Sequence, residues 1–320
     1  MTIRGYTTGM RILPGVMRAA AILMLLPAMF VQQGFAWGHD GHSMIDQVAG
    51  KTLPADVPEF LRSYGALDAL YFYGPVPDQQ WRSYAVPELN AAKEADHELN
   101  LEWAELAGPF PKRRYDYIRQ LQAAQPKHPE LTMTPEKMGM LPYAVDEDYE
   151  ALQAAMYEYR YLQNGGKDTR PVEAQIVYLA GILGHFVADG SQPMHASIQY
   201  NGWTGPNPNG YPTDKKIHAR FESDFVHANI TEVDFSGLVP AKPQVIQDVF
   251  TDFMQYLRHS NSLIEKTYQL DKAGGFRGAG APEGKAFVDE RLAAGATKLR
   301  DLIYTAWIRS ADPVPAYHGN

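Results

Sequence analysis

The chain has 320 residues, of which 45% are hydrophobic and 21% charged, so it can bury a core and is neither low-complexity nor collagen-like. The 37 acidic and 29 basic side chains give a net charge of −8, which excludes a basic groove that binds nucleic acid by broad phosphate neutralisation. The absence of Cys excludes disulfides, thiolate metal sites and a cysteine nucleophile, so metal ligands can only be His, Asp, Glu, backbone groups or water.

Residues 1–36 are predicted to be a secretory signal peptide. Three Arg residues precede or border an apolar run over residues 19–30, which is too short to cross a bilayer comfortably. Gly34 and Ala36 supply the small residues that a signal peptidase needs, so the predicted cut lies before Trp37. Cleavage would change the net charge to −11 and predicts a periplasmic or secreted protein, whereas an uncleaved anchor is the alternative.

The rest of the chain is predicted to be all-α, in one domain over residues 37–320. Apolar side chains recur every three or four residues, and alternating strand patterns are scarce. The predicted helices cover residues 55–70, 113–124, 147–162, 171–189, 244–270 and 282–310. The Gly-rich connector at residues 274–280 is too short to require a domain boundary.

The clearest predicted helix covers residues 171–189. Pro171 opens it and Gly190 follows its end, as helix punctuation predicts, and its apolar residues form one broad face. The next stretch, residues 201–214, is rich in Asn, Gly and Pro and is predicted to be a loop at the rim of a site.

Histidine and carboxylate residues occur at spacings that metal binding requires. His185 and Asp189 are four residues apart on one helix and therefore project from the same face, and His218 and Glu222 repeat this spacing. His195 follows the first pair after a turn. Taken singly, such residues are core histidines or surface salt bridges more often than ligands. Together they favour a metal site, because buried His185 and Asp189 would be costly unless they were paired or metal-bound.

The predicted new N-terminus adds further donors. Trp37-Gly-His-Asp-Gly-His42 offers a free amine, a carbonyl and an imidazole within six residues. Upstream of the helix pair, Asp78 in Pro-Asp-Gln-Gln-Trp-Arg and His97 in His-Glu-Leu-Asn-Leu-Glu supply one more carboxylate and one more imidazole.

These motifs resemble a known superfamily: the bacterial zinc-dependent phospholipases C and the single-strand nucleases of the S-one/P-one type, most closely its bacterial nuclease-like members. Trp37-Gly-x-x-Gly-His42, His185-Phe-Val-Ala-Asp189-Gly-Ser-Gln-Pro-Met-His195 and His218-x-x-x-Glu222 occur in the family order. The resemblance extends from residue 37 to about residue 230 and implies a multi-helix domain with a zinc cluster at the base of a cleft.

The resemblance also implies three zinc ions and their ligands. The first would be bound by Asp78, His97, His185 and Asp189; the second, bridged to it by Asp189, by His42 and the amine and carbonyl of Trp37; the third by His195, His218 and Glu222. Asp78 and Asp189 would orient the attacking water. The gap between Asp78 and His97 is longer than is usual in the family, so Asp68 or Asp96 could replace Asp78.

The predicted function is hydrolysis of single-stranded DNA or RNA by a zinc-dependent endonuclease, with 3′-nucleotidase activity as a further expectation. Zinc would activate water for attack on phosphorus and neutralise charge on the leaving oxygen. The alternative is a phospholipase C, which Glu222 favours because the nucleases usually have Asp there. Although the sequence contains no evident basic amphipathic helix for membrane binding, a short apolar loop would escape this test. The remaining alternative is a non-enzymatic zinc-binding protein, and no stable protein partner is predicted.

Overall fold

A computed structural model describes residues 37–314 of the chain, and within this range the fold is all-α, as predicted. The described residues contain no strand; they contain two isolated bridges, between Leu99 and Gly139 and between Tyr200 and Gly202. The predicted signal peptide, residues 1–36, lies outside the described residues.

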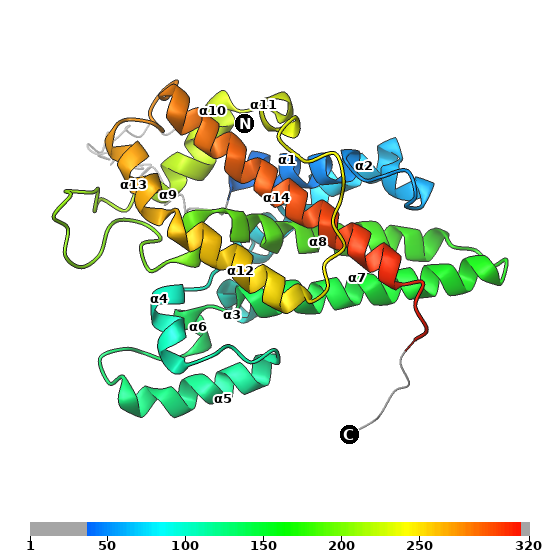
Figure 1. Cartoon of the computed structure of the whole chain (residues 1–320), viewed down its shortest axis with the longest axis horizontal. Coiled ribbons are helices and arrows are strands. Elements are labelled where there is room, and N and C mark those ends of the chain that lie inside the picture. Colours follow the sequence, from blue (N-terminus) through cyan, green and yellow to red (C-terminus); the bar gives the residue numbers. More distant parts are fainter. Residues whose placement is uncertain (1–36, 315–320) are drawn as a thin grey trace, which may run out of the picture. The chain divides into compact units, whose positions relative to one another are not determined.

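Helices of very different lengths make up the described chain (Figure 1). The longer ones are α1 (Gly38–Lys51), α2 (Tyr64–Tyr73), α5 (Arg114–Ala124), α7 (Leu141–Asn164), α8 (Arg170–Ser191), α12 (Val249–Ser262), α13 (Ile264–Lys272) and α14 (Pro282–Arg309). The short ones are α3 (Pro87–Lys93), α4 (Leu101–Ala104), α6 (Pro135–Met138), α9 (Ile217–Ala219), α10 (Phe225–Asn229) and α11 (Glu232–Ser236). Short 3-10 helices are η1 (Glu59–Arg62), η3 (Glu94–His97), η4 (Glu105–Ala107), η5 (Gln125–Lys127) and η6 (Pro193–Ala196), and π-helical turns are η2 (Pro77–Arg82) and η7 (Arg220–Asp224).

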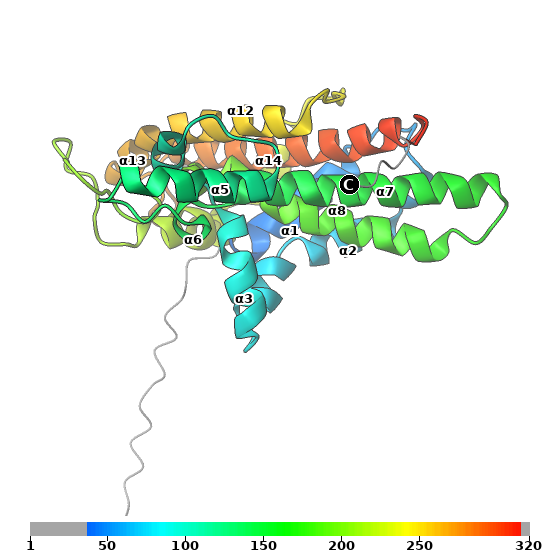
Figure 2. The ribbon, with the colours of Figure 1, turned by 90° about the horizontal axis from the view of Figure 1, so that it is seen from below.

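Helix α8 is the central element, in contact with α1, α2, α7 and α14. Figures 1 and 2 both show α7 and α8 running alongside each other, and Figure 1 shows α14 crossing them obliquely. Every residue of α8 from Ala180 to Ser191 is buried, so the part that carries His185 and Asp189 is enclosed on all sides. By length and composition α8 could cross a membrane, but 67% of its apolar stretch is buried inside the fold, as in the core helix of a globular protein.

Two glycines let α1 and α2 approach α8 closely. A Cβ atom at Gly181 would lie 2.4 Å from Tyr73 Cβ, and one at Gly184 would lie 2.2 Å from Asp46 Oδ1. Any larger residue at either position would push the helices apart. The close approach brings α1, which carries His42, against the buried half of α8.

The predicted helices over residues 113–124 and 282–310 are confirmed almost to the residue, but two others are interrupted. The predicted helix over residues 55–70 is wrong at its start: it contains η1, and α2 begins only after Ser63, whose hydroxyl accepts a hydrogen bond from Ala66 N. The predicted helix over residues 244–270 is interrupted at Leu263. Its first residues are not helical, because the Ile246 N–H bonds to Thr305 Oγ1 of α14 instead.

The ends of three other helices also differ from the prediction. Helix α7 begins at Leu141, before the predicted residue 147, with Pro142 in its first turn. Gly190 lies within α8, which ends at Ser191 just before Pro193. Helix α1 was not predicted, since its Gly and His residues weaken the helical signal.

Asp46 is a buried carboxylic acid on α1, one turn after His42. It has no exposed surface, and neither of its oxygens has a hydrogen-bond partner among the described residues. Burial raises the pKa of the Asp46 carboxyl well above its usual value. The group is therefore protonated in the fold at pH values where it is ionised in the unfolded chain.

The substitution Asp46→Asn should remove a pH-dependent loss of stability. When the pKa of a carboxyl is higher in the folded state than in the unfolded chain, its contribution to stability is complete below the pKa of the unfolded chain, about 3.9. As the pH rises from there toward the pKa of the folded state, the contribution declines by about 1.4 kcal/mol per pH unit. Urea unfolding of both proteins with chelator present, at several values between about pH 4 and about pH 6, measures the difference. We expect the native protein to lose stability relative to Asp46→Asn as the pH rises, and parallel pH profiles would contradict an un-ionised Asp46.

Candidate metal centre

The first group of candidate ligands surrounds the buried end of α8. His97 Nδ1, from η3, lies 3.0 Å from His185 Nε2 and 3.1 Å from Asp189 Oδ2. Asp78 Oδ1, from η2, lies 3.8 Å from the same His97 nitrogen and 3.9 Å from His185 Nε2. Three segments far apart in sequence thus bring four donor atoms to one buried point.

Asp189 connects this first group to a second. While Asp189 Oδ2 faces His97, Asp189 Oδ1 lies 3.5 Å from His42 Nε2 on α1. The His42 and His185 rings stack with their centroids 4.0 Å apart. One oxygen of the carboxylate therefore faces His97 and His185 and the other faces His42, which is the arrangement of a bridging ligand.

The third group lies where α8 has ended and the chain returns through α9. His195 Nε2 of η6 lies 3.1 Å from His218 Nε2, and His218 Nε2 lies 2.9 Å from Glu222 Oε2. His195 is 6% exposed, His218 6% and Glu222 0%. These side chains form a compact set of two imidazoles and one carboxylate, with ligand atoms within 4.8 Å of one another.

Backbone carbonyls fix the orientation of three of these imidazoles. His185 Nδ1 donates to Gly74 O at 2.8 Å, His195 Nδ1 to His97 O at 2.6 Å, and His218 Nδ1 to Tyr200 O at 2.7 Å. A carbonyl can only accept, so each Nδ1 carries a proton and each Nε2 is the nitrogen that faces the cluster. This outer-shell pattern is the one that metal-bound imidazoles show.

The distances and unpartnered atoms also fit zinc. Two ligand nitrogens on a tetrahedral zinc with bonds of about 2.0–2.1 Å are separated by about 3.3 Å. His185 Nε2 and His97 Nδ1 are 3.0 Å apart, and His195 Nε2 and His218 Nε2 are 3.1 Å apart. Two ring nitrogens this close need a proton or a cation between them. Among the described residues, Asp78 Oδ2 and Glu222 Oε1 are buried without a hydrogen-bond partner. The residues therefore fit the predicted metal in geometry and in donor chemistry.

Electrostatics favour neutral imidazoles in the first group. Burial lowers the pKa values of His97 and His185 well below the usual range. Burial also raises the pKa of Asp78 to about 7, although the Arg82 guanidinium acts in the opposite direction. Without a cation, burial disfavours the ionised form of the Asp78 carboxyl. A bound divalent ion would instead favour the carboxylate.

In the third group the charges are paired. Burial alone would raise the pKa of Glu222, but His218 and His195 lower it to about 2. Burial alone would lower the pKa of His218, yet the Glu222 carboxylate raises it overall. A metal ion would therefore displace a proton from this histidine when it binds.

Asp78, and not its sequence alternatives, joins the histidines. Asp68 is exposed on α2. Asp96 is buried, but its carboxylate pairs with Arg114 Nη1 at 2.7 Å and with Lys93 Nζ at 3.1 Å. Eight of the nine predicted ligands thus fall into the three groups.

Trp37, the ninth, lies beside the third group. Its backbone N donates to Glu222 Oε2 at 3.2 Å, although the resemblance implies that the Trp37 amine binds the second ion. Its indole is fully buried, and the indole Nε1 donates to Ala188 O and Ser191 Oγ, each at 2.8 Å. The indole therefore anchors the start of the described chain against the end of α8.

Sequence reasoning assigned no role to two polar side chains that contact the predicted ligands. Arg82 Nη1 donates to Asp78 Oδ1 at 3.1 Å, and Gln192 Nε2 donates to Glu222 Oε2 at 3.0 Å. Both residues lie inside motifs quoted for the resemblance, so their proximity to ligands in the sequence was the available signal. Their contacts would hold the two carboxylates in place.

Arg82→Ala should lower the phosphodiester hydrolysis that the sequence predicts about 10- to 100-fold, the usual cost of removing an outer-shell partner of a metal ligand. Arg82→Lys should lose less, because it keeps the charge beside Asp78. Initial rates on a soluble phosphodiester, together with the zinc content of each protein, measure the effect. The matched control is Arg170→Ala, which removes an exposed pair with Asp168 and should leave the rate unchanged. Equal rates for Arg82→Ala and the native protein would refute this role.

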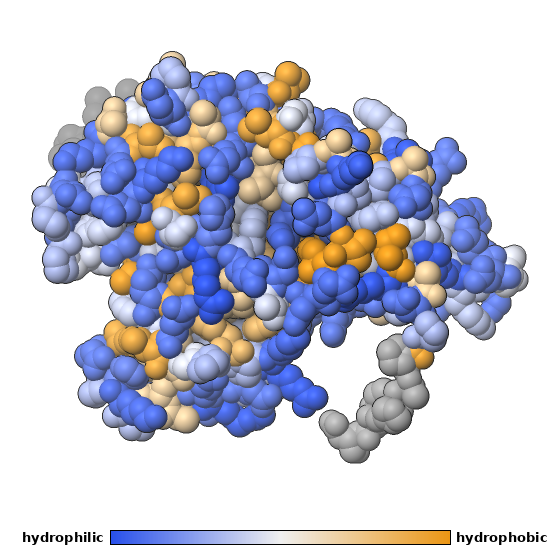
Figure 3. Space-filling model, in the orientation of Figure 1, coloured by the Kyte–Doolittle hydropathy of each residue, from blue (hydrophilic) through white to orange (hydrophobic). Residues whose placement is uncertain are grey.

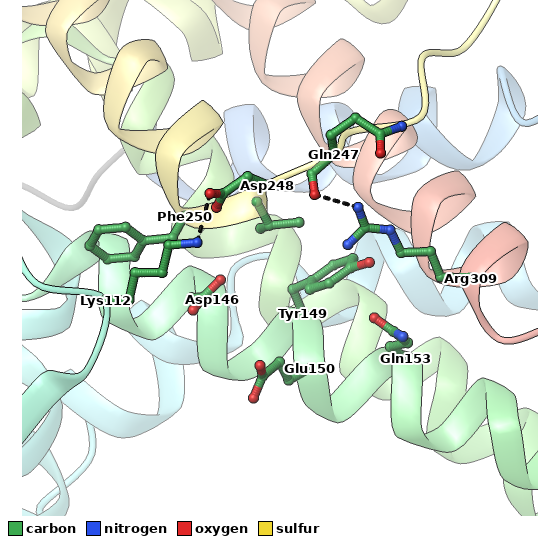
Figure 4. Close-up of a pocket in the computed structure, with 10 residues that line it drawn as sticks. Lys112, Asp146, Tyr149, Glu150, Gln153, Gln247, Asp248, Phe250 and Arg309 are labelled. Carbon is green, nitrogen blue, oxygen red and sulfur yellow. Dashed lines mark hydrogen bonds and ion pairs between the residues drawn. The ribbon is translucent and has the colours of Figure 1, made fainter. Parts of the chain in front are cut away.

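A cavity of about 280 Å³ lies away from the predicted ligands, between α7, α12 and the end of α14 (Figure 4). Lys112 Nζ bonds to Asp248 Oδ2 at 2.6 Å beside it, and Arg309 Nη2 bonds to Gln247 O at 2.5 Å. None of the predicted ligands lines the cavity, so it adds no member to the three ligand groups.

Comparison with known proteins gives little further support. No protein-family model matches the sequence, and no curated protein matches it. Among solved structures, the fold is similar to the alpha-toxin of an avian strain of Clostridium perfringens, with 14% identity and a TM-score of 0.42. The match covers 87% of this chain and 65% of that one. A similarity of this size does not establish a shared family, which stays a prediction.

Proposed function

We propose that the protein is a zinc-dependent hydrolase of phosphodiesters. The observation that carries the proposal is the set of three buried ligand groups, two of which share Asp189. Zinc at such sites would polarise a phosphoryl oxygen and lower the pKa of a bound water toward neutrality.

The protein's own residues would position the reactants. Asp78 Oδ2 has no hydrogen-bond partner among the described residues and could accept a hydrogen bond from a water at the cluster. Asp189 would hold the first two sites at a fixed separation. Arg82, with a side chain 16% exposed beside Asp78, would place a positive charge near a phosphate.

For the substrate, we propose single-stranded nucleic acid or nucleotides first. The acidic chain cannot bind such a substrate by a basic tract, so bases would stack on aromatic side chains. Tyr200 supports this proposal, because it is 48% exposed and its carbonyl orients His218 of the third group.

A lipid headgroup phosphodiester is the second candidate. It is favoured by exposed aliphatic side chains, Val86 and Leu89, on the segment that links the elements carrying Asp78 and His97. Aliphatic side chains bury well in lipid, whereas nucleic-acid bases gain little from them.

The chain that begins at Trp37 tests both substrates. We would assay single-stranded DNA, RNA and phosphatidylcholine in parallel, with chelator and then with added zinc. Cleavage that chelator abolishes and zinc restores would support the proposal, and the substrate cleaved would decide between the two candidates. Absence of cleavage of all three, and of a simple soluble phosphodiester, would refute it.

We also propose export to the periplasm or outside the cell, with cleavage before Trp37. The buried indole supports this cut, because it fixes Trp37 at the ligand cluster where a free amine would be a useful donor. An exported protein with a different N-terminal residue would refute it.

A further inference from the structure

The segment of residues 83–93, which we call the tip, projects beyond the other helices. Figure 2 shows α3, its helical part, extending away from them. None of the residues of α3 is buried. Tyr84 is 67% exposed, Val86 38% and Leu89 39%, so the tip presents apolar side chains that do not contribute to the core. The face shown in Figure 3 is mostly hydrophilic, with separate apolar patches, the broadest of them to the right of its centre.

The tip lies next to the candidate metal centre. Helix α3 packs against η2 and η3, the elements that carry Asp78 and His97. At its start, Arg82 is bonded to Asp78, and at its end, Lys93 is bonded to Asp96, which Arg114 also holds. The tip is therefore joined at both ends to the elements that carry Asp78 and His97.

The net charge and the side-chain types of the tip favour a lipid surface as its partner. Its only charged residues are Glu88 and Lys93, which cancel, while the whole chain is strongly acidic. A neutral tip on an acidic protein suits a zwitterionic lipid surface better than an anionic one. Tyr at a water–lipid boundary with aliphatic side chains beyond it is typical of interfacial insertion. Nucleic acid would need cationic or several aromatic side chains here, and the tip has a single aromatic residue.

We infer that the tip inserts into a zwitterionic bilayer and brings the metal centre to the level of the lipid headgroups. The role of this docking rests on the proposed function with a lipid headgroup as substrate. The binding itself requires no hydrolysis.

The test is flotation of the full mature protein with phosphatidylcholine vesicles. The double variant Tyr84→Ser with Leu89→Ser should bind at least about tenfold more weakly than the native protein, since it removes two inserted apolar groups. The matched control is Val233→Ser with Leu238→Ser, which removes exposed apolar groups on and just after α11 and should bind as the native protein does. If the double variant is poorly folded, vesicle binding is measured with Leu89→Ser alone, which removes no core contact.

Hydrolysis of bis(p-nitrophenyl) phosphate, a soluble diester, separates this inference from the proposed function. The tip variants should keep the native rate on it. Vesicle binding without any diester hydrolysis would leave docking supported and the proposed function refuted. No native binding to phosphatidylcholine, binding to anionic vesicles only, or equal loss in the control variant would overturn the inference. A dimer that the tip variant dissociates, without vesicle binding, would overturn it in favour of a protein interface.

Discussion

His185→Ala should abolish phosphodiester hydrolysis while the fold is retained. Removing an outer-shell partner typically costs 10- to 100-fold, so losing a ligand that faces His97, Asp78 and Asp189 should cost more than about 100-fold. Zinc content measured by elemental mass spectrometry should fall in parallel. Circular dichroism should show the helical content of the native protein, because the substitution removes no backbone hydrogen bond within α8.

The matched control for this experiment is His259→Ala. His259 is exposed on α12 and belongs to none of the three ligand groups, so its loss should change neither rate nor zinc content. Retained hydrolysis by His185→Ala would refute the metal-centre assignment. Full loss of structure in that variant would instead indicate a metal that serves stability alone, provided that the native protein hydrolyses none of the substrates.

Removing zinc should destabilise the protein by several kcal/mol. A site saturated at a hundred times its dissociation constant contributes about 2.7 kcal/mol, so three such sites would contribute about 8 kcal/mol. This is comparable with the whole stability of an ordinary domain, about 5–15 kcal/mol. Thermal unfolding in chelator should therefore begin at a much lower temperature, and added zinc should restore the midpoint.

The stabilisation by zinc should also shrink as the pH falls. His218 keeps a proton more readily than usual because the Glu222 carboxylate outweighs the effect of burial on its pKa, and zinc must displace that proton. Midpoints with and without zinc, compared at about pH 6 and about pH 8, measure this effect. Magnesium at the same concentration is the control, since imidazole-rich sites bind it poorly. Identical midpoints with zinc and with chelator would contradict a structural contribution of the metal.

Local patterns were sufficient where the determinants lie close together in sequence. Pro282 and the apolar periodicity define α14 without reference to the rest of the fold. The four-residue spacings of His185 with Asp189 and of His218 with Glu222 place each pair on one face, since one helical turn nearly returns to the same direction.

Distant contacts overruled local patterns elsewhere. The helical pattern over residues 244–270 fails at its start because Ile246 N–H bonds to Thr305, a residue of α14 that no window around Ile246 contains. In the same way, periodicity cannot show that Gly184 must lack a Cβ atom so that Asp46 and α1 can pack there.

The sequence by itself determined that the fold is helical and that its histidines and carboxylates occur at metal-binding spacings, because helical period and motif spacing are short-range properties. Only the tertiary structure distinguished Asp78 from Asp96, since both are buried and paired with an Arg, but Asp78 Oδ1 lies 3.8 Å from His97 Nδ1 and 3.9 Å from His185 Nε2. It also decided which imidazole nitrogens face the clusters and that the tip projects beside them. Those outcomes depend on which distant carbonyls, cations and helices the folded chain brings into contact, and such contacts have no signature in local sequence.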